Sequence, residues 1–270
     1  MEQKKRKRMY ALVKINLKVA AAVLVSLALC CAAVITVSAV TSEEGVEIPI
    51  VMYHSLLKDE ARHGKYVISP AEFENDLQYL KKHGYTTILM SDLIAYTQGK
   101  ELPEKPVLLT FDDGYYNNYL YAFELAKQYQ CKFVISPIGY YADQYTDTPD
   151  ENAYYSHATW EELQEMAESG LVEVQNHSYN LHKSDGSRLG VKKVSGETET
   201  QYESMLSQDL LTAQEKIEQH VGMRPTTFVY PFGAVSKGTP EIVRKLGFSA
   251  TLSCDCLLYT SPSPRDLSTS

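Results

Sequence analysis

The heptapeptide Leu108-Leu109-Thr110-Phe111-Asp112-Asp113-Gly114 runs an apolar β-strand directly into two adjacent carboxylates and a glycine. Consecutive side chains of a strand point in opposite directions, so we expect the two acids to have different jobs: one faces a metal ion and the other faces a water molecule. The alternative is an ordinary turn, because Asp-Gly is a common turn dipeptide. The other motifs of the chain help to distinguish a metal site from an ordinary turn.

A second polar cluster follows the predicted strand Leu171–Gln175 and has the sequence Asn176-His177-Ser178-Tyr179-Asn180-Leu181-His182. Five residues separate the two histidines, which would place them about 140° apart on a helix. We therefore expect an irregular loop, in which both rings can reach one ion. Together with Asp113 they form a set of two histidines and one carboxylate that suits Zn²⁺, Fe²⁺ or Co²⁺ and leaves coordination positions open.

Two further clusters also end predicted strands. Phe228-Val229-Tyr230-Pro231-Phe232-Gly233 closes one strand with an aromatic turn that could form the wall of a groove, and Met52-Tyr53-His54 closes another. Taken alone, the cluster at residues 228–233 is a simple turn at the end of a strand. For His54, an equally plausible interpretation is a histidine packed in the interior. The carboxyl ends of parallel strands meet at one mouth of a barrel, so we expect these residues to converge with the acids and the first histidine of the pair.

The sequence alternates short apolar runs with amphipathic stretches, which predicts parallel strands joined by crossover helices. Seven runs are candidate strands, several of them rich in β-branched residues. We therefore expect an α/β fold with a closed or nearly closed barrel, a distorted (β/α)7-type barrel, rather than an open doubly wound sheet. The candidate strands are Pro49–Tyr53, Thr86–Met90, Val107–Phe111, Lys132–Ser136, Leu171–Gln175, Thr226–Tyr230 and Phe248–Leu252.

Capping residues mark where helices begin. Ser69-Pro70-Ala71-Glu72 is a capping box with proline at the first helical position, and Thr159 to Glu162 is a second capping box. Two more helices are expected at Thr239–Leu246 and at about Glu199–Val221. Two longer stretches are expected to be loops on the active face, namely Gly139–Ala158 and Lys183–Gly196.

The first 40 residues differ in composition from the rest. Residues 1–18 carry a net charge of +6, and residues 19–40 form an uncharged, mostly Ala, Val and Leu run that would span roughly 30 Å of hydrocarbon as a helix. The basic flank predicts a cytoplasmic N-terminus and export of everything after a linker at residues 41–48. We expect an uncleaved membrane anchor. The alternative is a signal peptide cleaved after Ala39, which would release a secreted protein.

The exported part of the chain is acidic. The net charge of the whole chain is −8, and without the basic N-terminus it is −14. No stripe of Lys or Arg is evident, which argues against nucleic-acid binding and disfavours polyanionic substrates. Only Cys131, Cys254 and Cys256 follow the apolar segment. With no evident disulfide framework, a large core must hold the exported domain together.

The final segment, residues 256–270, is rich in Ser and Pro and aperiodic, and its beginning, CLLYTSPSPRD, looks like the translated read-through of a sequencing adaptor. We therefore expect the folded domain to span residues 49–255 and the natural chain to continue differently. The alternative is a genuine disordered tail.

The motifs TFDDG at residues 110–114, HSYNLH at 177–182 and YPFG at 230–233, in this order, resemble those of the polysaccharide deacetylases of the NodB type. The resemblance implies a metal-dependent enzyme that removes N-acetyl or O-acetyl groups from cell-wall and extracellular glycans on a distorted (β/α) barrel. The five-residue histidine separation and the leading PIVMYH most resemble the branch that acts on poly-N-acetylglucosamine. The similarity extends from about Ile48 to Asp255.

The resemblance also implies roles for individual residues. Asp113, His177 and His182 bind a divalent metal, for which zinc is expected and cobalt, iron or nickel are alternatives. Asp112 is the general base. The residues expected to contact substrate are His54, Tyr115, Tyr230, Pro231 and Phe232, and the backbone N–H of Tyr115 helps to hold the oxyanion.

The family's usual general acid is a histidine in a Leu-rich motif near the end of the domain, and this motif is not found beyond Asp255. We therefore expect the domain to be incomplete at its C-terminus. On this interpretation the natural protein is active and the present chain is impaired.

The expected partner is an acetylated amino-sugar polysaccharide: poly-N-acetylglucosamine, peptidoglycan or a chitin-like oligomer. No protein partner is predicted, and the expected location is the bacterial cell membrane, with a single-pass anchor and an extracytoplasmic catalytic domain.

One competing function is a noncatalytic, membrane-anchored glycan-binding protein, against which the intact Asp112 argues. Another is a glycoside hydrolase, but the adjacent Asp112 and Asp113 do not easily span the roughly 5–9.5 Å between opposed carboxylates that this chemistry needs.

Overall fold

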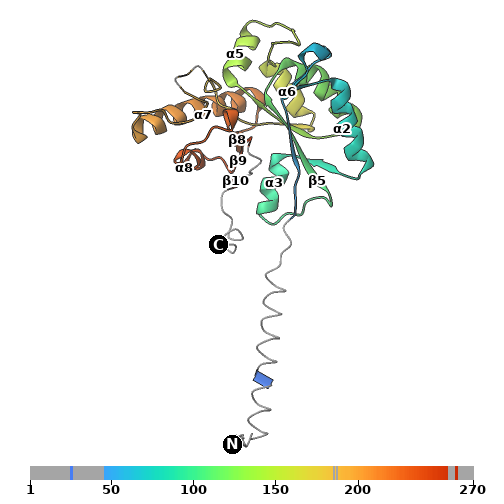
Figure 1. Cartoon of the computed structure of the whole chain (residues 1–270), viewed down its shortest axis with the longest axis horizontal. Coiled ribbons are helices and arrows are strands. Elements are labelled where there is room, and N and C mark those ends of the chain that lie inside the picture. Colours follow the sequence, from blue (N-terminus) through green and yellow to red (C-terminus); the bar gives the residue numbers. More distant parts are fainter. Residues whose placement is uncertain (1–24, 27–45, 185, 187, 255–258, 261–270) are drawn as a thin grey trace, which may run out of the picture. The chain divides into compact units, whose positions relative to one another are not determined.

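The computed structural model of the chain (Figure 1) describes residues 25–26, 46–184, 186, 188–254 and 259–260. Contacts divide the chain into two units, Met1–Glu47 and Ile48–Ser270, and nearly all described residues belong to the second. The predicted segments 1–18 and 19–40 lie outside the described residues, apart from Val25 and Ser26. Within the described part of the chain, no helix has both the length and the apolar character needed to cross a membrane.

Five parallel strands form the main sheet of the second unit, as the alternation of strands and helices predicted. They are β1 (Ile50–Tyr53), β4 (Thr86–Ile88), β5 (Pro106–Asp113), β6 (Phe133–Pro137) and β7 (Val172–Val174). β5 is the central strand, because β1, β4 and β6 all pair with it, and β7 pairs with β6. All eight residues of β5 are buried, which is typical of a strand covered on both faces.

A second sheet consists of β8 (Thr227–Val229), β9 (Ala250–Leu252) and β10 (Tyr259–Thr260). An isolated bridge between Asn176 and Phe228 joins the end of β7 to β8. β9 is parallel to β8 and pairs on its other edge with the antiparallel β10. Because β10 occupies that edge, no pairing among the described strands joins β9 to β1, and the predicted barrel is not confirmed. Apart from β10, the expected C-terminal tail lies outside the described residues.

Four helices lie where the sequence predicted them, and three of them begin with a capping box. Ser69, Thr159 and Thr198 each accept a hydrogen bond from the backbone three residues on, and the side chain at that position bonds back to the cap. Such reciprocal bonds satisfy donors that the first helical turn leaves unpaired. The helices are α2 (Pro70–Lys82), α6 (Trp160–Glu168), α7 (Glu199–Val221) and α8 (Thr239–Lys245).

Helix α5 (Gly139–Asp147) occupies the first half of the stretch Gly139–Ala158, so the expectation of a loop is wrong there. It has no side-chain cap. The N–H groups of its first two residues donate to the carbonyls of Ser178 and Tyr179, which are far away in sequence, so no local signal marks its start. The remaining elements are β2 (Ser55–Leu56), η1 (Glu60–Arg62), β3 (Val67–Ile68), α3 (Met90–Thr97), η2 (Asn118–Phe123), α4 (Glu124–Tyr129) and η3 (Pro231–Gly233).

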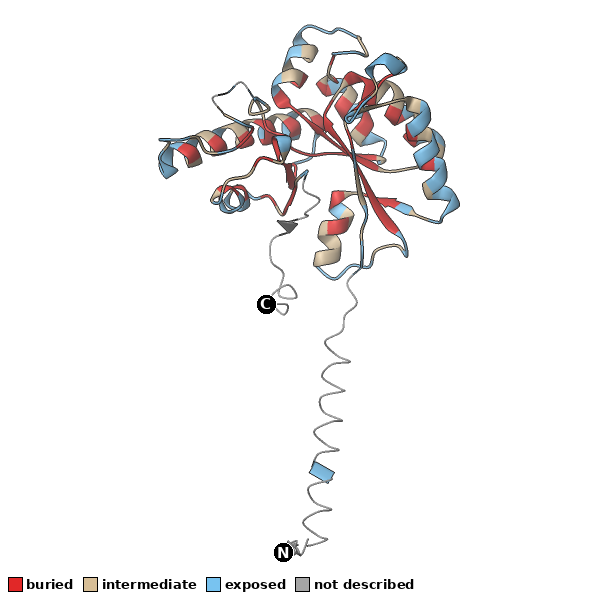
Figure 2. Ribbon diagram, in the orientation of Figure 1, coloured by how far each residue is buried: buried red, intermediate tan, exposed pale blue. Residues whose placement is uncertain are grey.

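Alternation along β5 divides the core into two clusters. Val107, Leu109 and Phe111 pack in one cluster with residues of α2, α4 and α6, whereas Leu108 belongs to a cluster on the other face with residues of β8 and β9. Figure 2 shows the buried central strands and the exposed outer faces of the helices. Because side chains alternate along a strand, Asp112 lies on the same inner face as Leu108.

Replacing Gly114 by Ala should destabilise the fold more than replacing Gly170 by Ala. Both glycines have a positive φ, 73° and 71°, so both substitutions carry a backbone cost of about 1 kcal/mol or more. A Cβ on Gly114 would also lie 2.7 Å from Cβ and 2.8 Å from Cα of Pro137, whereas Gly170 has open space. We expect a further loss of about 1–3 kcal/mol for Gly114→Ala. Urea unfolding followed by the fluorescence of Trp160 measures both, and equal losses would contradict the prediction.

Candidate metal centre

The last two residues of β5 place the two acids in different surroundings. Asp112 lies on the inner face with Thr110, close to Val229 and Leu252. Asp113 has a φ of 70°, in the left-handed region, and the chain turns there towards Gly114. Both carboxylates are buried. The adjacent acids therefore diverge, as expected for consecutive positions at a strand end.

Three side chains from two separate motifs meet beyond the ends of β5 and β7. Asp113 Oδ1 lies 3.4 Å from His177 Nε2 and 3.2 Å from His182 Nε2. One candidate ligand atom from each residue lies within 4.8 Å of the other two. The segment that carries the histidines is an irregular loop, with Ser178 at a φ of 73°. The structure thus brings together the three predicted metal ligands.

This donor set fits a divalent metal ion. The Nδ1 of His177 lies 2.9 Å from the carbonyl oxygen of Val229, so Nδ1 carries the proton and the Nε2 lone pair is free to bind a metal. Asp113 Oδ1 is buried and has no hydrogen-bond partner in the part of the chain that the structure describes. Buried oxygens are normally paired or bound to an ion, and a cation among these three residues would satisfy this one.

Helix α7 holds the histidine loop in place. Asn176 donates from Nδ2 to the carbonyl of Leu210 at 3.0 Å and accepts the Ser178 N–H at 2.8 Å. The carboxylate of Asp209 accepts the N–H groups of the next two loop residues, both at 2.8 Å. Sequence reasoning missed Asp209, because nothing in the pattern of α7 distinguishes it from the other acids of that helix.

Burial and charge act together on the three candidate ligands. Burial opposes ionisation of Asp113, but the adjacent His177 and the charge of His182 hold its pKa well below the usual range. Burial lowers the pKa of His182 to about 4, assisted by the charge of His177. Burial also disfavours the charged form of His177, yet the two aspartates raise its pKa overall. His182 is therefore neutral at pH 7 and available as a ligand.

Asp112 has the properties of a general base. Burial raises its pKa, against the charges of His177 and His54. Its Oδ1 is buried without a hydrogen-bond partner among the described residues. A carboxylate with a raised pKa and a free lone pair, next to a set of candidate metal ligands, accepts a proton more readily than an exposed carboxylate does.

His54 and Phe232 flank the centre from opposite ends of the sequence. The charge of His54 acts on both carboxylates, and its ring packs on Tyr66 with centroids 4.8 Å apart. Phe232 has a φ of 59°, is 42% exposed, and lies with its ring 4.2 Å from that of His182. An exposed, backbone-strained aromatic residue beside a metal ligand is placed to meet a substrate.

The remaining predicted substrate contacts differ in exposure. The phenol of Tyr115 lies beside Asp113, and burial together with the charge of that carboxylate raises its pKa. Pro231 and Tyr230 are buried, and Tyr230 packs on Phe228 in the core. Of the aromatic turn, only Phe232 therefore presents an exposed ring.

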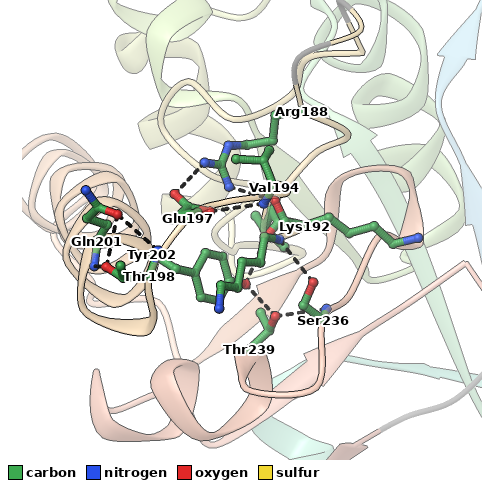
Figure 3. A network of polar contacts seen from close by, with 11 residues as sticks. Arg188, Lys192, Val194, Glu197, Thr198, Gln201, Tyr202, Ser236 and Thr239 are labelled. Carbon is green, nitrogen blue, oxygen red and sulfur yellow. Dashed lines mark hydrogen bonds and ion pairs between the residues drawn. The ribbon is translucent and has the colours of Figure 1, made fainter.

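Of the predicted loop Lys183–Gly196, residues 188–196 contact α7 and the segment that leads into α8 (Figure 3). Arg188 donates to the Glu197 carboxylate at 2.7 Å, and both side chains are largely buried. The hydroxyl of Tyr202, on α7, donates to a loop carbonyl at 2.8 Å. A Cβ on Gly190 would lie 2.7 Å from a carbonyl oxygen of η3, so the two segments are in direct contact. This loop thus buttresses the turn that flanks the metal centre.

His157 is a neighbour of the centre that no motif indicated. Its ring packs at a tilt against that of Tyr115 and stacks on that of Tyr141, with centroids 4.8 and 4.4 Å apart. Burial lowers its pKa to about 4, against the charge of Asp113. A single histidine within a predicted loop has no partner at a diagnostic spacing, so sequence reasoning could not find it.

Fold and site together define an α/β protein with parallel strands and a centre of two histidines and one carboxylate beside a second acid. The sequence model described as Polysaccharide deacetylase matches residues 99–251, more than half of the chain. The chain belongs to the polysaccharide deacetylase family, as its three motifs predicted. His54 lies outside the matched residues.

Curated relatives carry related names. The chain is 28% identical over 220 residues to the poly-beta-1,6-N-acetyl-D-glucosamine N-deacetylase of Escherichia coli K12, which covers 73% of this chain and 32% of the relative. It is 27% identical over 211 residues to the putative polysaccharide deacetylase YxkH of Bacillus subtilis, covering 77% of this chain and 65% of that protein. The chain therefore spans about a third of the length of the Escherichia coli relative.

Solved structures share the fold. A de-N-acetylase from Aggregatibacter actinomycetemcomitans is 27% identical, with a TM-score of 0.68 over 79% of this chain and 90% of that chain. IcaB from Ammonifex degensii is 30% identical, with a TM-score of 0.64 over 77% of this chain and 84% of that chain. These similarities support the α/β deacetylase fold.

Replacing His157 by Phe should weaken the pH dependence of stability in the metal-free protein. The pKa of His157 is about 4 in the folded state and about 6.5 in an unfolded chain. Between these values the unfolded chain binds a proton that the folded chain does not, so stability falls as the pH decreases through this range. His157 contributes up to about 3 kcal/mol to that loss. Urea unfolding of both proteins at pH 7 and pH 4.5 measures it, and parallel losses would refute the prediction.

Proposed function

We propose that this chain is a metal-dependent hydrolase that removes N-acetyl groups from an amino-sugar polysaccharide. The observation that carries the proposal is the meeting of Asp113, His177 and His182 beside Asp112, a buried acid with a free oxygen. Membership of the polysaccharide deacetylase family supports the same reaction.

Asp113, His177 and His182 would hold the cation, for which zinc is expected and cobalt, iron or nickel are alternatives. When bound, the cation would polarise the acetamide carbonyl and make a nearby water more acidic. Asp112 accepts the proton of the attacking water. The backbone N–H of Tyr115 donates to the oxyanion that develops on the former carbonyl oxygen.

We assign the protonation of the leaving amine to His54. The sequence motifs suggested that the general acid is missing from this chain. His54 follows β1 directly, and its charge acts on both Asp112 and Asp113, so it lies near the reacting groups. Histidine is the side chain used most often for proton transfer in enzymes. On this proposal the chain carries its own general acid.

The proposed substrate is poly-N-acetylglucosamine, with peptidoglycan and chitin-like oligomers as alternatives. The Escherichia coli relative is named for deacetylating the β-1,6-linked polymer. A noncatalytic glycan-binding function is not favoured, because both the base and the ligand set are intact.

We further propose an extracytoplasmic location, supported by the basic and apolar residues of segments 1–18 and 19–40, with anchoring or release after Ala39 as the two alternatives.

Asp112→Asn should lower kcat for acetate release at least about 100-fold while metal binding persists, because it removes the proton acceptor and keeps the ligands. His177→Ala should remove both activity and stoichiometric metal. Acetate release from N-acetylglucosamine oligomers and metal analysis of the purified protein measure the two effects. Asp147→Asn, a change at an exposed carboxylate at the end of α5, is the matched control and should leave both unchanged. If Asp112→Asn keeps its activity, Asp112 is not the general base.

His54→Gln should reduce kcat by about 100-fold or more and leave metal content unchanged, because glutamine has similar hydrogen-bonding capacity but cannot transfer a proton at neutral pH. The loss should be smaller for an activated acetate ester, whose leaving group needs no protonation. Equal losses on both substrates would contradict the role of His54 as proton donor.

A further inference from the structure

Residues 156–158 run antiparallel to the turn that follows the two acids. The Tyr116 N–H donates to the Ser156 carbonyl at 2.8 Å, and the Ala158 N–H donates to the Gly114 carbonyl at 2.9 Å. Tyr115 and His157 form the bridged pair between these two bonds. In this antiparallel pattern the middle pair is not hydrogen-bonded to each other, so the Tyr115 N–H points away from residues 156–158. That N–H remains available as a donor to a ligand.

The side chains of the same pair are also in contact. The ring of His157 packs at a tilt of 31° against that of Tyr115, with centroids 4.8 Å apart, and stacks on that of Tyr141 at 4.4 Å. Tyr141 belongs to α5, whose first N–H groups bond to the histidine loop. These three rings therefore link the turn after the acids to α5, the helix that is bonded to the histidine loop. Tyr115 is held both through its backbone neighbours and through its ring.

We propose that His157 is a positioning residue for the deacetylation reaction: by packing its ring against that of Tyr115, with which it is paired, it fixes the direction in which the Tyr115 N–H points. The inference rests on the proposed function. A donor to a developing oxyanion stabilises the transition state more than the bound substrate, so a misdirected N–H lowers kcat and leaves KM nearly unchanged. His157 supplies no atom to the candidate metal-ligand set, so we expect the affinity for zinc to be retained.

The test compares His157→Ala with His157→Phe, because Phe keeps a stacked ring and Ala does not. With N-acetylglucosamine oligomers and kcat expressed per bound zinc ion, His157→Ala should lose about 10- to 100-fold in kcat, with KM within about twofold. His157→Phe should stay within about threefold of the wild type. Tyr154→Ala is the control, since this exposed ring of the same segment packs near Arg62, and its kcat should be unchanged.

A second readout does not depend on turnover. In the zinc-loaded, ¹⁵N-labelled protein, the Tyr115 amide resonance should shift on titration with acetate in the wild type and in His157→Phe, but not in His157→Ala. Wild-type kcat per zinc in His157→Ala, or equal losses in the Ala and Phe variants, would overturn the proposal. If the unmodified protein releases no acetate, the proposed function fails. The titration then decides alone: an equal amide response in the wild type and His157→Ala overturns the positioning role.

Discussion

The burial of β5 up to its last residue is the constraint on which the rest of the site depends. A strand that ends in two buried carboxylates places two negative charges away from water, and such charges must be paired, protonated or bound to a cation. Asp113 is compensated by the two histidines, whereas burial keeps the pKa of Asp112 raised. The same burial therefore produces a ligand and a base from neighbouring residues.

The histidines can compensate Asp113 only if their loop is held still, and α7 provides the support. Asp209 and the carbonyl of Leu210 accept hydrogen bonds from the histidine loop. Tyr202, nearer the start of the helix, donates a hydrogen bond to the loop that follows it. A long helix with one buried face is stiff enough to fix both loops. The metal centre thus depends on residues that lie about 30 positions from the histidines in sequence and belong to no recognisable motif.

Local signals predicted much of the fold because they act within a few residues. The capping boxes at Ser69 and Thr159 marked helix starts, and the short apolar runs marked the five strands of the main sheet and the parallel pair β8 and β9. The start of α5 was missed because its cap consists of carbonyls from the histidine loop. The barrel is not confirmed because β10 takes the edge of β9 that closure would need, and edge pairing depends on which strand is nearby in space.

The sequence alone determined the family, the parallel α/β organisation and the residue types of the metal centre, because strand ends and motif order are local properties. Only the tertiary structure decided which residues support that centre. His157 reaches Tyr115 by antiparallel pairing, and Val229 orients His177 across two strands. The tertiary structure also places Tyr230 in the core and leaves Phe232, two residues later, exposed beside His182. These contacts join segments tens of residues apart, and their geometry follows from packing, which no short stretch of sequence encodes.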